Sequence, residues 1–184
     1  MAATDPGGPE TGGLQPSLRL RPLRVGDEAQ FAAAHRQVEE EDGYVFGLWY
    51  RPGLHWPDYL AAMAAQRRGH QLAPGRVPAT FLVADVGGVI VGRTSIRHEL
   101  NDFLQREGGH IGYVVRPAHR RRGYATEILR QSVVIARAAG VDDVLVTCDD
   151  GNVASAKVIE RCGGVLESVV PTAHGPPKRR YWIR

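Results

Sequence analysis

The chain has 184 residues, of which 43% are hydrophobic and 23% charged, a composition that predicts one compact globular domain. It contains no run of about 18 apolar residues and lacks the basic-then-apolar start of a secretory signal, so we expect a cytoplasmic protein rather than a membrane or exported one. The formal net charge is +3, so a nucleic-acid partner is permitted but not required.

The only two cysteines, Cys148 and Cys162, are too few for a disulfide framework and lack the paired spacing of a zinc site. Neither has an evident partner base in the sequence. We therefore expect reduced thiols that pack in the core rather than act as nucleophiles, and we expect no metal.

The N-terminal part divides at about residue 17. Residues 1–16 are rich in Gly, Pro and Thr without apolar periodicity, which predicts a disordered segment ahead of a domain over residues 17–184. Residues 18–22 alternate like a short strand. Asp27 can cap a first helix, and a second helix is expected over residues 57–68. The faces that these helices would share with the core contain Phe31, Ala34, Val38, Leu60, Met63, Ala64 and Arg67.

The middle of the chain changes to the period of β-strands. Residues 80–84 and 89–96 are β-rich and flank a glycine pair, which predicts a hairpin. A further strand is expected over residues 109–115, ended by Pro117, because proline cannot donate a hydrogen bond to a sheet.

The C-terminal half alternates helices and strands. Apolar residues at helical spacing predict a helix from Gly123 to Gly140, followed by a strand over 143–148, a helix over 152–161, and strands over 165–170 and 180–183. This order predicts an α/β (α+β) domain with a single mixed, mostly antiparallel sheet flanked by helices.

The most informative segment is Ile111–Glu127, in which a strand passes through a basic, glycine-containing turn directly into an amphipathic helix. Such a turn directs free backbone N–H groups at one point, and the helix dipole adds partial positive charge there. Gly123 allows close approach of a phosphate, Ala125 leaves room beside it, and Arg120–Arg122 add charge. The spacing matches neither GxxxxGK(S/T) nor GxGxxG, so an ATP-binding P-loop and a Rossmann fold are disfavoured. A solvated basic surface or a nucleic-acid patch is the alternative interpretation.

Here the chain resembles the GNAT superfamily of N-acetyltransferases, whose acetyl-CoA signature is Gln/Arg-x-x-Gly-x-Gly/Ala at the start of the helix after the fourth strand. Arg120–Ala125 fits that signature. The wider context agrees, with a strand and Pro117 before the helix, then a strand that ends in two aspartates, Asn152, a helix and a glycine pair. The resemblance covers about residues 18–184 and is greatest to the branch of ribosomal-protein acetyltransferases and their small-molecule relatives.

The resemblance implies that acetyl-CoA is the co-substrate and that a primary amine of a small molecule or peptide attacks its thioester directly, with no acetyl-enzyme. A backbone N–H of the strand would polarise the carbonyl oxygen as charge develops. A homodimer is also a possible quaternary state of the chain. The implied cofactor-binding residues are Val114, Val115, Arg120, Arg121, Arg122, Gly123, Tyr124, Ala125 and Asn152. Among them Val114 and Val115 would pair with pantetheine like an added strand, and for Asn152 a purely structural N-cap is an equal alternative.

Two residues are candidates for the general base. His110 is one, although a partly buried strand histidine without catalytic role is the alternative. Glu99, expected at the end of the third strand, is the other, since a carboxylate there could accept the amine's proton directly or through water.

Two features of the acceptor half depend on the resemblance. The family builds its acceptor site partly from the first two helices, where the chain has four carboxylates, Glu39–Asp42, beside aromatic residues. These could attract a cationic amine, or they could be an exposed helix end followed by a hydrophobic lid. Many family members also place a tyrosine seven residues after the asparagine to protonate the leaving thiolate, and this chain has Ile159 there. We therefore expect no tyrosine to be an essential acid, or Ser155 or a water to relay the proton.

The sequence favours an N-acetyltransferase. Two other classes remain: a CoA-binding or sensing module without catalysis, and, less favoured, a small basic nucleic-acid-binding domain.

Overall fold

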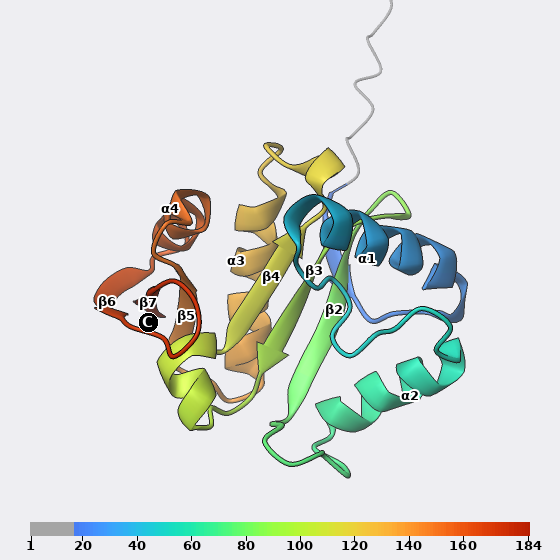
Figure 1. The fold of residues 1–184 in the computed structure, drawn as a ribbon, viewed down its shortest axis with the longest axis horizontal. Helices are drawn as coiled ribbons and strands as arrows, with labels where there is room; N and C mark the ends of the chain where they lie inside the picture. Colours follow the sequence, from blue (N-terminus) through green and yellow to red (C-terminus); the bar gives the residue numbers. More distant parts are fainter. Residues whose placement is uncertain (1–16) are drawn as a thin grey trace, which may run out of the picture.

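The computed structural model describes residues 17–184, so the disordered segment expected over 1–16 lies outside the described residues. Its core is one seven-stranded sheet in the order β1-β2-β3-β4-β5-β7-β6 (Figure 1). Only β4 and β5 run parallel, and every other neighbouring pair is antiparallel. The predicted fold class, a single mixed and mostly antiparallel sheet flanked by helices, is therefore confirmed.

The elements follow the predicted order, with small shifts at their ends. In chain order they are β1 Arg19–Arg21, α1 Glu28–Asp42, α2 Trp56–Arg67, β2 Ala79–Val86, β3 Val89–Arg97, β4 Ile111–Val115, α3 Tyr124–Ala138, β5 Val144–Asp149, α4 Val153–Arg161, β6 Val165–Val170 and β7 Lys178–Ile183.

Helices cover both faces of the sheet (Figure 1). α1 and α2 pack on one face around Phe31, while α3 and α4 pack on the other around Leu129. Side chains of a strand alternate between its two faces, so β4 contributes Ile111 to the core beneath α3 and α4 and Val114 to the core beneath α1 and α2. The sheet is thus covered by apolar side chains on both sides around β4.

β4 and β5 are joined only at their beginnings. Ile111 pairs with Val146, and no later residue of β4 has a partner in β5 within the described chain. Just before this pair, the His110 N–H donates to the Leu145 carbonyl at 2.7 Å, and the Leu145 N–H donates to Nδ1 of His110 at 2.9 Å. The two strands therefore separate beyond Ile111, in the middle of the sheet.

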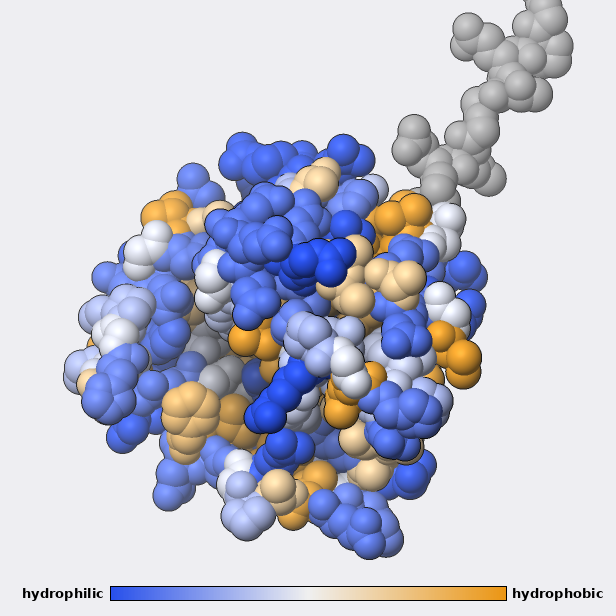
Figure 2. All heavy atoms as spheres, turned by 45° about the vertical axis from the view of Figure 1, so that its right-hand side comes forward, coloured by the Kyte–Doolittle hydropathy of each residue, from blue (hydrophilic) through white to orange (hydrophobic). Residues whose placement is uncertain are grey.

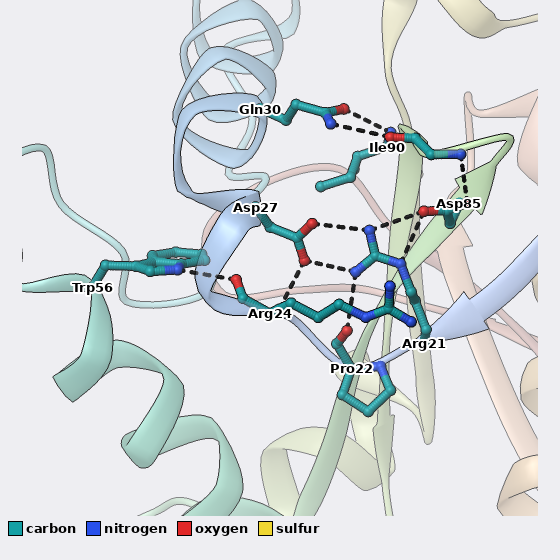
Figure 3. A network of polar contacts seen from close by, with 9 residues as sticks. Arg21, Pro22, Arg24, Asp27, Gln30, Trp56, Asp85 and Ile90 are labelled. Carbon is teal, nitrogen blue, oxygen red and sulfur yellow. Dashed lines mark hydrogen bonds and ion pairs between the residues drawn. The ribbon is translucent and has the colours of Figure 1, made fainter.

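A buried ionic network holds the first strand and first helix to the sheet (Figure 3). Arg21 donates to both carboxylate oxygens of Asp27, at 2.6 and 2.9 Å, and to Asp85 of β2 at 2.9 Å. Asp27 also accepts the Arg24 N–H at 2.8 Å, and it makes no side-chain cap to α1. The expected capping role of Asp27 is therefore wrong: its carboxylate instead closes the preceding short helical turn and neutralises Arg21.

Candidate active site

The turn before α3 presents a row of unused backbone donors. The amides of residues 121–126 make no hydrogen bond within residues 17–184, and α3 has no side-chain N-cap. Arg121 and Gly123 both have left-handed φ values, 64° and 80°, which turn successive N–H groups to one side. A Cβ built on Gly123 would meet no atom within 4 Å. The turn is therefore open, and together with the dipole of α3 it can hold an anion such as a pyrophosphate.

The three arginines of the turn have different surroundings. Arg120 donates to both carboxylate oxygens of Asp42 at the end of α1, and its Nε donates to the Val115 carbonyl at 3.2 Å. Arg121 and Arg122 are exposed. Arg120 thus connects the turn to α1 and β4, whereas Arg121 and Arg122 are placed to add charge around a bound phosphate.

The acidic run Glu39–Asp42 lies beside this basic turn. Asp42 pairs with Arg120, and the three glutamates are exposed. Of the aromatic residues that follow, Phe46 and Trp56 are core residues that surround Phe31, with 0% and 2% exposure, whereas Tyr44 and Trp49 are exposed. The structure therefore shows an exposed helix end followed by an apolar lid, and it does not place the four carboxylates together as a cation site.

The free edge of β4 faces the gap left by β5. The Arg97 N–H donates to the His110 carbonyl and the Arg116 N–H to the Val91 carbonyl, so the even-numbered positions of β4 hydrogen bond with β3. Because this direction alternates along a strand, Tyr113 and Val115 direct their backbone groups into the gap. The expectation for Val114 is corrected, since its backbone pairs with Arg93 of β3 and its side chain is buried against α1.

Two hydroxyl groups meet across this gap. Tyr113 Oη lies 2.8 Å from Ser155 Oγ, which joins β4 to the first turn of α4. Burial raises the pKa of Tyr113 to about 12, so the phenol stays protonated. Asn152 accepts the Ser155 N–H through Oδ1 at 3.0 Å, which confirms the predicted N-cap and leaves its amide nitrogen free for another contact. Ile159 is fully buried.

The two candidate bases lie in different settings and make no contact with each other. His110 is 8% exposed, and its Nδ1 lone pair accepts the Leu145 N–H. Burial, helped by repulsion from Arg97, lowers the pKa of His110 to about 4. Its neutral ring therefore carries the proton on Nε2 and has no lone pair for a substrate. Glu99 lies beyond the end of β3 at Arg97, and its exposed carboxylate makes no hydrogen bond or ion pair within the described residues.

The two cysteine thiols lie in surroundings that oppose ionisation. Burial raises the pKa of Cys148 and of Cys162, which disfavours the nucleophilic thiolate form. No group of three or more His, Cys, Asp or Glu side chains among residues 17–184 is arranged to hold a metal ion. None of the helices in that part of the chain is long and apolar enough to cross a membrane.

Sequence reasoning missed two arginines of β3, Arg93 and Arg97. Arg93 is 3% exposed, and Arg97 is half-buried. The signal was present, because two arginines at i and i+4 of an otherwise apolar and small-residue strand must lie on the same face of the sheet. A charged pair on a buried face needs either partners or a function.

The chain matches the sequence model of a family described as acetyltransferase (GNAT) domain over residues 17–165. Solved structures share its fold. It is similar to yncA from Salmonella typhimurium with its cofactor acetyl-CoA (17% identity, 91% of this chain and 93% of that one, TM-score 0.63). It is also similar to Mycobacterium smegmatis RimJ in complex with CoA-disulfide (18% identity, 90% of this chain and 81% of that one, TM-score 0.66). A third similar structure is an acetyltransferase from Agrobacterium tumefaciens (21% identity, 99% of each chain, TM-score 0.63). A search of curated protein sequences finds no match. Since the family match covers most of the chain, including the turn before α3, this protein belongs to the GNAT acetyltransferase family.

Proposed function

We propose that this protein transfers an acetyl group from acetyl-CoA to a primary amine by direct attack. The observation that carries the proposal is the open turn of residues 121–126, which follows β4 after a short helical turn over Pro117–His119, and β4 is a strand whose partner separates from it. The turn offers amides to a pyrophosphate, and the free strand edge offers amides to the pantetheine arm. Acetyl-CoA in yncA and CoA-disulfide in RimJ support this assignment by similarity of fold.

The cofactor would be held from the end of β4 to the start of α4. The amides of residues 121–125 would bind the pyrophosphate, with Arg121 and Arg122 adding charge and Arg120 holding the turn in place. The backbone groups of Tyr113 and the N–H of Val115 would pair with pantetheine, and the free amide nitrogen of Asn152 is placed to contact the same arm from α4.

The chemistry is one addition and one elimination. The neutral amine attacks the thioester carbonyl carbon, a C–N bond forms, and the carbonyl oxygen becomes an oxyanion that a backbone N–H in the gap, from Tyr113 or Val115, can stabilise. The C–S bond then breaks, the electron pair leaves on sulfur, and the nitrogen loses a proton. Of the two candidate bases, we propose Glu99, acting through water, because the lone pair of His110 is already used by Leu145.

The departing thiolate needs no strong acid, because a thiol of pKa about 8.5 leaves as a tolerably stable anion. Ile159 cannot donate a proton. The hydroxyl pair of Tyr113 and Ser155 lies at the gap and is the candidate to return a proton to sulfur.

A CoA-binding module without catalysis is the second candidate function. The specific observations that favour it are the apolar Ile159 and a candidate base, His110, whose lone pair is occupied. The nucleic-acid interpretation loses support, because Arg120 is neutralised by Asp42.

The test combines calorimetry with a rate assay. Titration with acetyl-CoA measures binding, and release of free CoA thiol during a screen of primary amines measures transfer. Amine-dependent thiol release supports the acetyltransferase. Tight binding without release from any amine would leave the CoA-binding module, and absence of binding would reject both.

A further inference from the structure

Arg93 and Arg97 lie on the same face of β3, toward α1, α2 and the segment that joins these helices. Arg93 donates from Nε to the Phe46 carbonyl and from Nη2 to the Val45 carbonyl, both at 2.9 Å, and from Nη1 to the Gly112 carbonyl at 3.0 Å. That joining segment crosses in front of the sheet in Figure 1. Arg93 is therefore fixed between the segment and β4.

Arg97 has fewer partners. Its Nη1 donates to the Gly108 carbonyl at 3.2 Å and more weakly to the Gly109 carbonyl at 3.4 Å. Its Nε and Nη2 make no hydrogen bond within residues 17–184, yet neither atom is sealed inside the protein. One edge of this guanidinium is thus available to a ligand.

Neither arginine has a counterion. No carboxylate in the described part of the chain forms an ion pair with either guanidinium. Burial lowers the pKa of both arginines, and the neighbouring groups that shift these values include Tyr44 but no carboxylate. Arginine stays protonated in proteins, so this face holds two positive charges that the protein itself does not neutralise.

Both guanidiniums meet at Gly112. Arg93 binds its carbonyl, and a Cβ built on Gly112 would lie 3.2 Å from Nη1 of Arg97. Gly112 is the first residue of β4 beyond the pairing with β5, so the charges lie where the gap opens. The phosphate-binding turn begins beyond the other end of β4, and strand geometry puts about 10 Å of chain between Gly112 and Val115. The two arginines are therefore remote from the phosphates of the cofactor.

The side of the molecule that carries α1 and α2 is hollowed near its centre, where hydrophobic and strongly hydrophilic side chains meet (Figure 2). Tyr44 and Trp49 are 59% and 42% exposed, and both belong to the segment that joins α1 to α2 and covers β3. An acceptor that enters from this side would meet the free edge of Arg97 next to the start of the gap.

We infer that the acceptor is a small amine with a carboxylate close to its amino group, as in a free amino acid, and that Arg97 binds this carboxylate. The inference rests on the proposed acetyl transfer and names the class of substrate for it. A guanidinium edge with two free N–H-bearing nitrogens matches the two oxygens of a carboxylate. Arg93 is a positioning residue, since it holds Gly112 and the covering segment and adds to the positive potential.

The test compares the standard L-amino acids with their carboxamides, using thiol release at saturating acetyl-CoA. A carboxamide has nearly the same shape but no charge. Its amine is less basic, so more of it is neutral at pH 7, and amine availability alone favours the carboxamide. We expect the best amino acid to exceed its carboxamide by at least about tenfold in kcat/KM, the scale of a charge-assisted hydrogen bond.

Variants connect this preference to Arg97. We expect Arg97→Gln to remove the preference for the carboxylate. Arg97→Lys should retain part of it, because lysine keeps the charge but loses the planar pair of donors that matches a carboxylate. Arg106→Gln is the matched control, since Arg106 lies in the helical turn Leu104–Gly108, whose Gly108 carbonyl accepts from Arg97, and its own side chain is 60% exposed and pairs with Glu107. It should keep the wild-type preference. Equal acetyl-CoA affinity in all variants would show that the cofactor site is intact.

The outcomes separate the inference from the proposed function. If carboxamides or the N-terminal amines of short peptide amides are the better acceptors, or if Arg97→Gln keeps the preference, the inference is overturned while acetyl transfer stands. If no amine releases thiol, acetyl transfer fails, and calorimetry with the amino acids on the CoA-saturated protein then decides. Binding that Arg97→Gln abolishes would support the carboxylate site, and no binding to the wild type would reject it.

Discussion

His110 binds both backbone polar groups of Leu145: its N–H donates to the Leu145 carbonyl, and its Nδ1 accepts the Leu145 N–H. These contacts clamp β4 to β5 immediately before the strands separate. A histidine can make both contacts only while its ring is neutral, since a protonated ring has no acceptor. The clamp at the base of the gap is therefore sensitive to acid.

The first prediction concerns stability at low pH. The pKa of His110 is about 4 in the folded protein, against about 6.5 when unfolded, so only the unfolded chain takes up the proton between these values. The free energy of unfolding should fall by up to about 3 kcal/mol as pH decreases from 6.5 to 4. Above pH 6.5, His110 should cause no further change of the free energy of unfolding with pH. Buried His35, whose pKa is also lowered, adds in the same direction.

Urea unfolding at pH 7 and pH 5 measures this effect. His110→Asn keeps an acceptor near Leu145 but does not titrate, so it should reduce the difference between the two pH values by about 2 kcal/mol. His174→Asn, at an exposed position of the β6–β7 loop, is the control and should retain the wild-type difference. A wild-type difference in His110→Asn as well would contradict the assignment.

The second prediction concerns the pH dependence of the rate. The rate should rise with pH through a single ionisation, that of the acceptor amine or of its base, and His110 is not this base because it stays neutral at all pH values well above 4. His110→Asn should therefore leave the midpoint of the pH–rate profile unchanged, whereas Glu99→Gln tests the carboxylate. If both variants keep the profile, the ionisation is that of the amine itself. A shifted midpoint in His110→Asn would restore histidine as the base.

The third prediction concerns the hydroxyl pair in the gap. Tyr113→Phe and Ser155→Ala should each lower turnover by no more than about tenfold at saturating acetyl-CoA, and the double variant should be no slower than the slower single one, because the two groups act as one relay. Tyr124→Phe and Tyr181→Phe serve as comparisons, since Tyr181 is buried with its hydroxyl on Glu160. A loss of about a hundredfold or more in any tyrosine variant would identify an essential acid and refute this expectation.

The fourth prediction concerns the turn before α3, where we propose that the pyrophosphate binds. Gly123→Glu should abolish acetyl-CoA binding in a protein that still folds, because a negative side chain would enter the row of free amides. Left-handed backbone costs a non-glycine residue about 1–2 kcal/mol, so some stability is lost as well. Calorimetry with acetyl-CoA and a thermal melt measure the two effects.

Gly140→Glu is the matched control for that strain. Gly140 follows the other end of α3 and has a φ of 91°, and a Cβ added there, as at Gly123, would meet no atom within 4 Å. The two variants should lose similar stability, but only Gly123→Glu should lose the cofactor. Unchanged cofactor affinity in folded Gly123→Glu would remove the turn from the site.

The sequence by itself determined the features that depend on neighbours along the chain. The order of strands and helices follows from apolar periodicity and from glycine and proline signals, and the turn before α3 was evident because its donors belong to consecutive residues. The N-cap by Asn152 is equally local, since donor and acceptor lie three residues apart.

Only the tertiary structure decided the features that depend on register between distant segments. Arg21, which holds Asp27, also reaches Asp85 across 64 residues of chain, and Asp42 reaches Arg120 across 78. Whether Val114 or Tyr113 faces the gap depends on which residues of β4 pair with β3, and a shift of one residue would reverse the answer. The period of a strand already puts Arg93 and Arg97 on one face, but only the structure shows that Gly112 of β4 lies beside both guanidiniums, because nothing local in the sequence states which strand will be the neighbour.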